Sequence, residues 1–467
     1  MSLKRVSVII ILLSAVALAS FAPAFAARPQ QSQQTYVLSA SKWGAAQEEA
    51  VRQAGGTVVF GHKGAGVGVA TSDAPDFLSR VLASSAISGG AADQITQWQS
   101  PVNEVSLEEA AVTPNDETFV NLQWNIKAVE APAAWAAGYT GQGVRVAVLD
   151  GGIHSTHVDL VNQIDVARST SFVPGFAFNQ DVGTFWHGTH VAGIVAASDN
   201  AIGTIGIAPG ATVVGVKVLH NGSGAFSWII QGILYASTPI AEGGAGADII
   251  NMSLGATFAR GGGNTGAGQL IAALNKAVNF AERNQVLVVS AAGNDGIDMD
   301  HSGNTISVPA MSGSGIAVSA TGPEGYAVNF PNGATNFRAP ASYTNYGVSI
   351  VNVAAPGGDA RLPGNANCAI PAVPAGNVVT PCWVFDMVLS TSRGAGASTT
   401  SYSFASGTSM AAPAASAVAA LIKQRFPGIS VGALKNKLAN TADDEGKPGQ
   451  DPFYGRGFVN ARRAVTE

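Results

Sequence analysis

One serine of this chain stands where a nucleophile can be activated. Ser409 belongs to the motif GTSMAAP (residues 407–413), and the alanine-rich apolar run that follows predicts a buried helix as far as Ile422. The unpaired N–H groups and the dipole at a helix N-terminus favour negative charge, which develops beside a serine nucleophile during acyl transfer. A serine that only caps the helix is the commoner reason for such a pattern, so this chemistry depends on partners elsewhere.

Three further polar residues stand where strands end or helices begin. Asp150 follows an apolar run that predicts a buried strand, and an active-site carboxylate stands at such a place. His187 opens a predicted helix, and its neutral imidazole can accept a hydroxyl proton near pH 7. Asn294 comes just after another predicted strand, where its side-chain amide can stabilise an oxyanion.

Each of these residues also has an ordinary structural interpretation. Asp150-Gly151 and Gly293-Asn294 are common turn dipeptides. His187 and His190 lack the glutamate and the four-residue spacing of a zinc-binding helix, and His190 is better interpreted as a structural, hydrogen-bonded side chain. Together, however, Asp150, His187, Asn294 and Ser409 supply an orienting group, a base, an oxyanion donor and a nucleophile. The joint pattern predicts acyl transfer through a serine.

These residues lie in a part of the chain where apolar strands alternate with helices. We expect strands over 144–149, 213–219, 248–254, 286–290, 316–319 and 350–353, and helices over 187–197, 227–235, 269–283 and after Ser409. Unbroken apolar strands with helices between them predict an α/β fold, with a parallel sheet covered by helices on both faces. The carboxyl ends of such strands carry the chemistry, so the four candidates are expected at one edge of the sheet.

The first residues predict export. Lys4 and Arg5 precede an apolar run, and AFA (residues 24–26) offers a cleavage site, so residues 1–26 are expected to be a secretory signal peptide. The apolar run is shorter than the roughly 20 residues of a membrane span, and no later stretch is long enough. The mature protein is therefore expected to be secreted and to have no membrane span.

A small α+β unit follows the signal peptide. We expect strands at 36–38, 58–60 and 66–70 and helices at 45–54 and 77–82. The acidic stretch 101–116 carries no clear strand, so we interpret it as a boundary. This divides the rest of the chain into residues 27–113 and 114–467.

The composition excludes some classes of function. Lys and Arg number 25 against 30 Asp and Glu, the net charge is −5, and no basic run occurs, so nucleic acid is not an expected partner. The two cysteines, Cys368 and Cys382, are close in sequence and are expected to form one disulfide in an oxidising compartment.

Four motifs resemble those of the subtilisin-like (subtilase) serine peptidases: DGGI (150–153), HGTHVAG (187–193), AAGN (291–294) and GTSMAAP (407–413). The resemblance spans roughly residues 124–464 and implies the subtilisin-like fold. It implies that Ser409 is the nucleophile, that His187 is the base that then protonates the leaving amine, and that Asp150 holds the imidazole's tautomer. Asn294 and the N–H of Ser409 would be the oxyanion donors.

The resemblance also assigns residues to the substrate. Ser253, Leu254 and Gly255 match the edge on which a peptide pairs as an added strand. Gly293 would help to shape the first side-chain pocket. The lack of charge expected there suggests small or apolar substrate residues.

A structural calcium ion is also implied, although catalysis would need no cofactor. Asp159 lies at the spacing of a ligand-bearing loop of the family, and Asn200 lies in residues 198–204, which match the loop after the histidine helix; both supply oxygen ligands, which suit Ca²⁺. Ordinary polar turns are the alternative for this loop.

The implied function is a secreted serine endopeptidase that is made as a zymogen and processes itself. The region from 36 to about 98 resembles, more loosely, the family's inhibitory prodomain, so residues 27–113 are the expected prodomain and 114–467 the expected peptidase domain. The cut is expected between about 106 and 119. The expected partners are protein or peptide substrates and the chain's own prodomain.

Three other functions can be compared with these residues. A dedicated processing peptidase for one precursor is the alternative within the class, and an inactive binding or adhesion module would be expected to lack a triad member. A lipase would need G-x-S-x-G, but Ala411 stands two residues after Ser409.

About thirty extra residues between 357 and 388, which include both cysteines, are expected to form a disulfide-tied loop near the substrate cleft. There they would narrow specificity or add stability.

Overall fold

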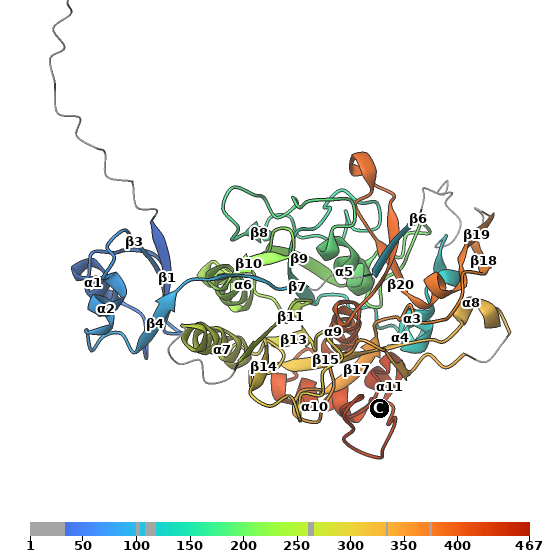
Figure 1. Cartoon of the computed structure of the whole chain (residues 1–467). Coiled ribbons are helices and arrows are strands. Elements are labelled where there is room, and N and C mark those ends of the chain that lie inside the picture. The colour runs from blue at the N-terminus through green and yellow to red at the C-terminus, as the bar shows by residue number, and fades with distance from the viewer. Residues whose placement is uncertain (1–32, 100–102, 108–117, 260–265, 333–334, 373–375) are drawn as a thin grey trace, which may run out of the picture.

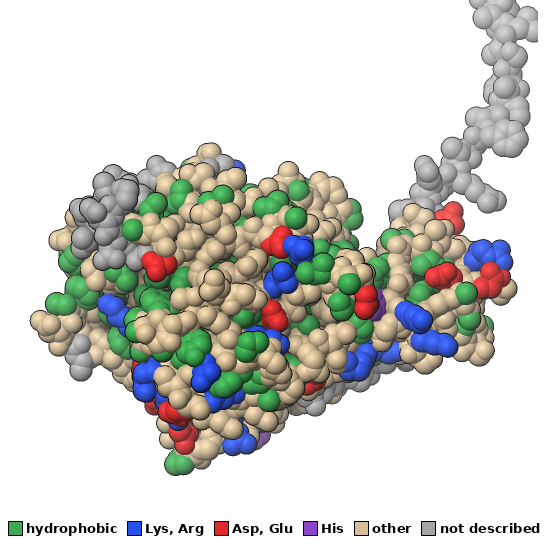
Figure 2. Space-filling model, turned by 180° about the vertical axis from the view of Figure 1, so that it is seen from behind, with side chains coloured by type: hydrophobic (Ala, Val, Ile, Leu, Met, Phe, Trp, Pro, Cys, Tyr) green, Lys and Arg blue, Asp and Glu red, His purple; other side chains and the backbone are tan. Residues whose placement is uncertain are grey.

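The structure is a computed structural model that describes residues 33–99, 103–107, 118–259, 266–332, 335–372 and 376–467. A small N-terminal unit lies beside a large unit (Figure 1), and in the space-filling view it forms a lobe at one side of the molecule (Figure 2). The signal peptide expected at residues 1–26 lies outside the described residues. Within the described ranges, no helix is long and apolar enough to cross a membrane.

The large unit is built on a mostly parallel sheet. Its described strands run in the order β16-β15-β13-β11-β7-β9-β8, with β17 beside β15, and every pair is parallel except β15 with β16. The predicted parallel sheet is confirmed, but the last predicted strand begins three residues late. The strands are β7 Arg145–Asp150, β8 Thr170–Ser171, β9 Thr212–Lys217, β11 Ile249–Met252, β13 Leu287–Ala291, β15 Ile316–Gly322, β16 Ala339–Pro340 and β17 Val353–Pro356.

Helices cover both faces of this sheet because its strands are apolar on both sides. In β7, Val146 and Val148 belong to one hydrophobic core, whereas Ala147 and Leu149 belong to the other. The first core is completed by α5 and α9, and the second by α6 and α7. The helices are α5 His187–Ala196, α6 Phe226–Ser237, α7 Ala267–Arg283 and α9 Thr408–Arg425.

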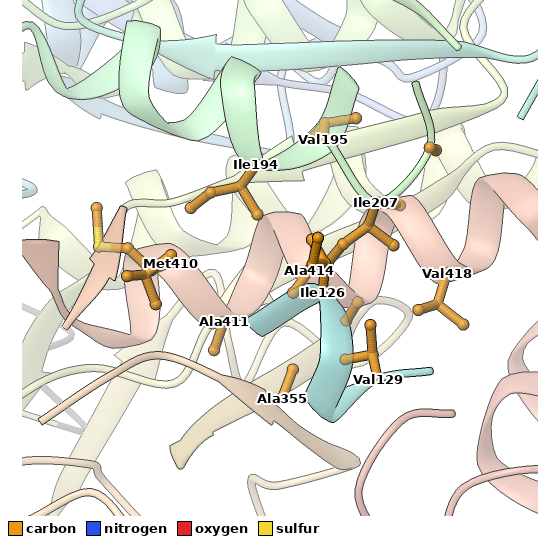
Figure 3. Close-up of a cluster of buried hydrophobic side chains, with 14 of the residues drawn as sticks. Ile126, Val129, Ile194, Val195, Ile207, Ala355, Met410, Ala411, Ala414 and Val418 are labelled. Atoms are coloured by element: carbon orange, nitrogen blue, oxygen red, sulfur yellow. The ribbon is translucent and has the colours of Figure 1, made fainter. Parts of the chain in front are cut away.

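Helix α9 lies at the centre of the large unit. All of its residues from Thr408 to Ile422 are buried, and it packs against α5 and against strands β11, β13, β15 and β17. Alanines along the helix allow its neighbours to approach closely. Figure 3 shows this packing, with Met410, Ala411, Ala414 and Val418 of α9 beside Ile126, Val129, Ile194, Val195, Ile207 and Ala355.

The small unit is a four-stranded antiparallel sheet with two helices on one face. The strand order is β2-β3-β1-β4, and α1 and α2 cover Tyr36 and Leu38 of β1. The opposite face, which includes Val37 and Val67, packs on α6 and α7 of the large unit. The predicted α+β unit is confirmed, with β1 Gln34–Ser39, α1 Ala45–Gln53, β2 Thr57–His62, β3 Val67–Ser72, α2 Phe77–Leu82 and β4 Gly89–Ala92.

The chain that leaves the small unit crosses the large unit; we call its described residues 95–99 and 103–107 the crossing segment. β5 (Ile95–Gln97) pairs antiparallel with β10 (Ser223–Ala225). β6 (Asn103–Leu107) pairs antiparallel with β21 (Tyr402–Ser406), which continues the sheet from β20 (Val388–Thr391). The prediction that residues 101–116 hold no strand is therefore wrong at β6, which pairs with β21 and packs its alternating Val105 and Leu107 against the core of the large unit.

The disulfide between Cys368 and Cys382 is present and closes a hairpin of β18 (Asn367–Ala372) and β19 (Gly376–Pro381). The hairpin packs on η1 (Val120–Leu122) and α8 (Tyr326–Asn329). Figure 1 shows it at the end of the large unit that lies opposite the small unit, away from β10. The expectation that this loop borders the substrate edge is wrong, because its anchors are η1 and α8.

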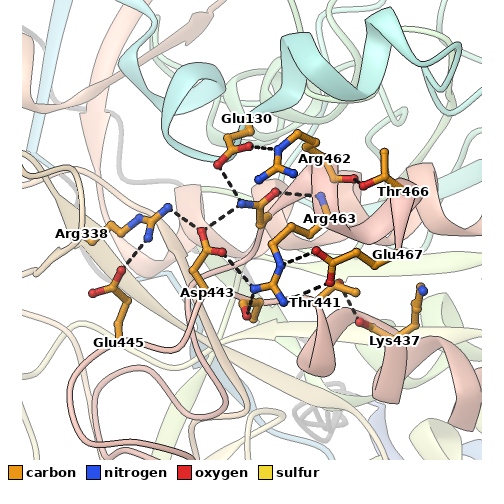
Figure 4. Close-up of polar contacts among 12 residues, drawn as sticks. Glu130, Arg338, Lys437, Thr441, Asp443, Glu445, Arg462, Arg463, Thr466 and Glu467 are labelled. Atoms are coloured by element: carbon orange, nitrogen blue, oxygen red, sulfur yellow. Dashed lines mark hydrogen bonds and ion pairs between the residues drawn. The ribbon is translucent and has the colours of Figure 1, made fainter.

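A charged cluster fastens the C-terminal helix (Figure 4). Asp443 lies at its centre and pairs with Arg338 over 2.5 Å and with Arg463 over 3.1 Å. Arg463 also pairs with Glu467 over 2.9 Å. Single exposed pairs contribute little, but this half-buried network joins segments far apart in the sequence.

The other described elements are α3 Trp124–Ala128, α4 Ala131–Ala136, η2 Ile240–Glu242, β12 Ala256–Ala259, β14 Thr305–Val308, η3 Cys382–Asp386, η4 Ala395–Ala397, α10 Val431–Asn440 and α11 Ala461–Thr466.

Candidate active site

Asp150 and His187 meet where the last residue of β7 faces the first turn of α5. Nδ1 of His187 lies 2.9 Å from Oδ2 and 3.1 Å from Oδ1 of Asp150, and both side chains are buried. Gly188 allows this approach, because a Cβ there would lie 2.6 Å from the carbonyl oxygen of Gly152 and 2.9 Å from Cβ of Asp150. An aspartate at Nδ1 leaves Nε2 as the ring atom that accepts a proton.

Ser409 is the second residue of α9, and Ser253 fixes the turn that carries it. Pro413 has no N–H to donate to the Ser409 carbonyl, four residues earlier in the helix. Oγ of Ser253 donates to that carbonyl over 2.7 Å instead. Oγ of Ser409 in turn donates to the Ser253 carbonyl over 3.3 Å. Ser253, which the sequence placed on the substrate edge, thus also holds the nucleophile's backbone.

His187 and Ser409 are not hydrogen-bonded to each other in this structure. Nε2 of His187 is buried and has no hydrogen-bond partner among the described residues. Oγ of Ser409 is directed to the Ser253 carbonyl. The hydrogen bonds of a catalytic pair often tighten only when the reacting groups are bound, so this geometry agrees with a proton-accepting role for Nε2.

Asn294 lies beside the N-terminus of α9 and is held by the residue before Ser409. Its Oδ1 accepts hydrogen bonds from the N–H of Thr408 over 2.9 Å and from its hydroxyl over 2.7 Å. With Oδ1 occupied, the Nδ2 group is left to donate. Asn294 and Ser409 line the same small pocket.

His190 lies inside the protein, as the sequence predicted for a structural histidine. It is completely buried, and Nε2 lies 2.9 Å from the carbonyl oxygen of Ser403. Burial lowers the pKa of His190 to about 3, so the ring is neutral. The hydroxyls of Ser390 and Thr391 donate to the carbonyls of His190 and Thr189 over 2.8 Å each. These contacts hold the first turn of α5, which carries His187.

Residues 141–457 match the model of the subtilase family. This chain belongs to the subtilase family. M-protease of Shouchella clausii (strain KSM-K16) is 37% identical to it over 359 residues, which are 77% of this chain and 73% of the relative. Subtilisin E of Bacillus subtilis (strain 168) is 34% identical over 346 residues, which are 74% of this chain and 71% of the relative. The chain is therefore a serine endopeptidase.

Solved structures resemble this subtilase as well. A protease from Pseudoalteromonas arctica PAMC 21717 superposes with a TM-score of 0.57 and 31% identity, covering 76% of this chain and 99% of that chain. The epidermin leader peptide processing protease of Staphylococcus aureus superposes with a TM-score of 0.69 over 93% of this chain and 98% of that chain. At 20% identity, the second likeness shows the fold alone.

The predicted substrate edge of this subtilase carries the crossing segment. The N–H of Gly255 donates to the carbonyl of Trp98 over 2.8 Å, and the N–H of Trp98 donates to the carbonyl of Gly222 over 2.9 Å. The Trp98 ring is buried against Phe226 and Phe258. An added strand therefore occupies the edge, held by main-chain hydrogen bonds and by one buried side chain.

A small pocket opens beside Ser409 and Asn294, and Leu254, Gly255 and Gly293 line it. Gly293 has a φ of 109°, and a Cβ there would overlap the Asn345 side chain, so glycine is required. Asp295 and Ser307 also line the pocket. The expectation of an uncharged pocket is wrong, because the carboxylate of Asp295 directly follows the oxyanion residue.

Gln99 is the residue of this site that sequence reasoning missed. Its Nε2 donates to Oδ1 of Asp150 over 2.8 Å and lies 2.9 Å from Nδ1 of His187. Nothing in the local sequence marks this glutamine, since its contacts follow from the path of the crossing segment.

The loop predicted to bind calcium is filled with hydrogen-bond donors. Oδ2 of Asp159 accepts from the N–H of Thr204 over 2.9 Å and from its hydroxyl over 3.3 Å, while Nδ2 of Asn200 lies 3.4 Å from Oδ1. Burial raises the pKa of Asp159 to about 7, and the bonds from Thr204 oppose this. No group of three His, Cys, Asp or Glu side chains in the described ranges is arranged to hold a metal ion. Calcium takes oxygen ligands rather than donors, so this arrangement does not fit it.

Proposed function

We propose that this subtilase is the precursor of a secreted endopeptidase, with Asp150, His187 and Ser409 as its triad. Oγ of Ser409 attacks the carbonyl carbon of the scissile peptide bond while Nε2 of His187 takes the hydroxyl proton. His187 then gives this proton to the leaving amine, and an acyl-enzyme remains on Ser409. A water molecule attacks the acyl group with the same histidine as base and releases the acid product. Asp150 stabilises the imidazolium in both halves.

The negative oxygen of each tetrahedral intermediate needs two donors, and α9 and Asn294 supply them. The N–H of Ser409 lies in the first turn of α9, where backbone N–H groups have no intrahelical acceptor. Nδ2 of Asn294 is the second donor, oriented through the two bonds from Thr408 to Oδ1. One such side-chain donor lowers the barrier by about 3–4 kcal/mol.

The path of the crossing segment is the observation that supports the proposal that the chain is a zymogen. β5 and Trp98 pair with β10 and Gly255 on one side of the site, and β6 pairs with β21 on the other. β21 ends at Ser406, three residues before Ser409. Between the two pairings, the Gln99 side chain contacts Asp150. The crossing segment, which follows the N-terminal unit, thus takes the path expected for a peptide substrate, as the chain of an inhibitory prodomain does.

We place the self-cleavage between Gln99 and Asn103. The described residues that flank this stretch contact the site, because Asn103 is paired with Ser406 and the Gln99 side chain contacts Asp150 and His187. The stretch lies upstream of the region 106–119 that the sequence favoured, most of which is outside the described residues. Residues from Asn103 onward would stay with the peptidase, and the small unit would be released as the prodomain after export by the signal peptide.

Two other functions have less support. A peptidase dedicated to one precursor would agree with the fold shared with the leader peptide processing protease, but that likeness is 20% identical, whereas relatives at 34–37% identity are named as alkaline proteases and subtilisins. An inactive binding module is disfavoured because Asp150, His187 and Ser409 are all present and the first two are hydrogen-bonded.

The N-termini of the exported protein test this proposal. Intact-mass and N-terminal peptide analysis of protein collected outside the cell should find a precursor that begins after Ala26 and a mature form that begins between Ser100 and Asn103. Protein retained inside the cell would contradict the export. A mature form that begins beyond Leu107 would contradict the proposed cleavage position but not the peptidase.

A further inference from the structure

A lysine is buried directly beside the catalytic aspartate. Lys217 is the last residue of β9, and the register of the sheet pairs it with Asp150, the last residue of β7. In neighbouring parallel strands, residues in register point to the same face. The Lys217 side chain is fully buried. A buried ammonium group is costly unless it is paired and hydrogen-bonded, so its partners indicate why it is there.

The ammonium group joins two pieces of backbone that form the site. Nζ of Lys217 donates to the carbonyl of Gly151, the residue after the catalytic aspartate. It also donates to the carbonyl of Leu219 over 2.7 Å. Leu219 leads into the loop that ends at Gly222, whose carbonyl accepts from Trp98 on the substrate edge. One side chain therefore holds both the backbone of the triad and the backbone that binds the peptide.

A buried carboxylate holds the lysine in turn. Oδ1 of Asp181 lies 3.9 Å from Nζ of Lys217 and accepts hydrogen bonds from the N–H of Asn221 over 3.1 Å and of Val182 over 3.0 Å. A Cβ on Gly151 would overlap Oδ2 of Asp181, so the carboxylate lies directly against the residue that follows Asp150. Burial raises the pKa of Asp181, and the charge of Lys217 opposes this. Burial lowers the pKa of Lys217, and Asp181 and Asp150 oppose this.

We propose that Lys217, held by Asp181, is a positioning residue of this peptidase: it fixes the backbone behind Asp150 and sets the charge that the Asp150–His187 pair experiences. This inference uses only the peptidase activity and does not depend on the zymogen proposal. Among the described residues, neither side chain has a hydrogen bond or ion pair with Ser409. Both act through Asp150 and through the loop of the substrate edge.

The two charges have opposite effects on the base. Both charges act on the base through its partner Asp150: Lys217 attracts the negative charge of Asp150, whereas Asp181 repels it. The other titratable groups near the pair are His190 in α5, Glu104 in β6 and His220, whose Nδ1 lies 3.5 Å from Asp181. These groups are the same in every variant, so a difference between variants reports Lys217 and Asp181 alone.

The test is the dependence of kcat/KM on pH for the active enzyme with a chromogenic peptide. Lys217→Met should move the acid limb to higher pH by about 0.5 unit or more, and Asp181→Asn should move it to lower pH. The acid limb of the double variant should lie between those of the two single variants. Kcat should fall by about tenfold in Lys217→Met because Gly151 loses its anchor. Lys435→Met, which removes a partly buried surface lysine paired with Glu282, is the matched control and should leave the profile unchanged.

Opposite shifts are the decisive readout, because a purely structural role would lower activity without moving the limb in two directions. Unshifted limbs, or shifts of the same sign in both single variants, would overturn the proposal. If Lys217→Met does not fold, Asp181→Asn decides alone, and a limb that stays in place or moves to higher pH overturns the proposal. An inactive wild-type enzyme would instead contradict the peptidase itself.

Discussion

The side-chain amide of Gln99 donates a hydrogen bond to Oδ1 of Asp150 over 2.8 Å. The same nitrogen lies 2.9 Å from Nδ1 of His187, which lies 2.9 Å from Oδ2 of Asp150. The carboxylate is therefore shared between the catalytic base and a residue of the crossing segment. Because Asp150 stabilises the imidazolium by its charge, a second donor weakens the base. In the proposed zymogen, the crossing segment would therefore inhibit the enzyme in two ways: it covers the cleft, and its Gln99 binds Asp150.

This contact predicts that Gln99→Ala speeds maturation. Removing a hydrogen bond to a carboxylate should weaken the inhibited state by about 1.5–3 kcal/mol, which is roughly a tenfold or greater gain in processing rate. The half-time of the precursor band in a refolding time course measures it. Gln97→Ala is the control, since Gln97 contacts Ser223 rather than the triad. Equal acceleration by both variants, or none by Gln99→Ala, would contradict this role.

Asn294→Ala should reduce kcat and leave KM almost unchanged. Because we assign Nδ2 of Asn294 to the oxyanion, its loss should lower kcat by about 10²–10³-fold. Steady-state kinetics on a peptide substrate measure both constants. Thr408→Val removes the hydroxyl that orients Oδ1 and should cause a smaller decrease in kcat. A change confined to KM would remove Asn294 from the oxyanion site.

The disulfide hairpin is expected to add stability rather than specificity. Cys368 and Cys382 are 14 residues apart, and closing a loop of this length stabilises a fold by about 3 kcal/mol in the chain-entropy model. Changing both to Ser in a Ser409→Ala background, which prevents autolysis, should lower the free energy of unfolding in urea by about 2–3 kcal/mol. In the active enzyme, kcat/KM should stay the same. An altered substrate preference would show that the hairpin reaches the cleft.

His190 predicts a loss of stability in acid. Burial lowers its pKa in the folded state to about 3, whereas the unfolded chain binds this proton near pH 6.5. As the pH falls below about 6.5, the unfolded state gains a proton that the folded state does not, which costs about 1.4 kcal/mol per pH unit. Asp159, with its pKa raised to about 7, has the opposite sign and partly offsets this.

His190→Gln keeps a donor for the Ser403 carbonyl but removes the titration. Urea unfolding of the Ser409→Ala protein between pH 7 and 4 should show a shallower loss for this variant, by about 1.4 kcal/mol per pH unit. His301→Gln, which changes an exposed histidine, is the control. Parallel stability curves for wild type and His190→Gln would contradict the assignment.

Much of the fold could be predicted from the sequence, because the central strands are apolar on both faces. β7 ends at Asp150, and α5 and α9 begin at or beside His187 and Ser409, so the motifs themselves mark the edge where strands end. The disulfide followed from the presence of only two cysteines. These features depend on local patterns, which a single sequence contains.

Features that depend on the path of the chain could not be predicted. β6 has only two alternating apolar residues, Val105 and Leu107, which is too short a pattern to indicate a strand without its pairing with β21. Gln99 contacts Asp150 only because the crossing segment passes that residue. Lys217 ends an apolar strand and resembles a surface lysine until the register shows Asp150 beside it. The hairpin's position was wrong because sequence distance from the triad does not report distance in space.

The most direct test of the account compares the wild-type full chain with Ser409→Ala, purified under conditions without other proteases. Intact mass measures the product. The wild type should lose its N-terminal unit by a cut between Gln99 and Asn103, and Ser409→Ala should remain whole. Cleavage of Ser409→Ala at the same position would contradict a self-processing peptidase with Ser409 as its nucleophile.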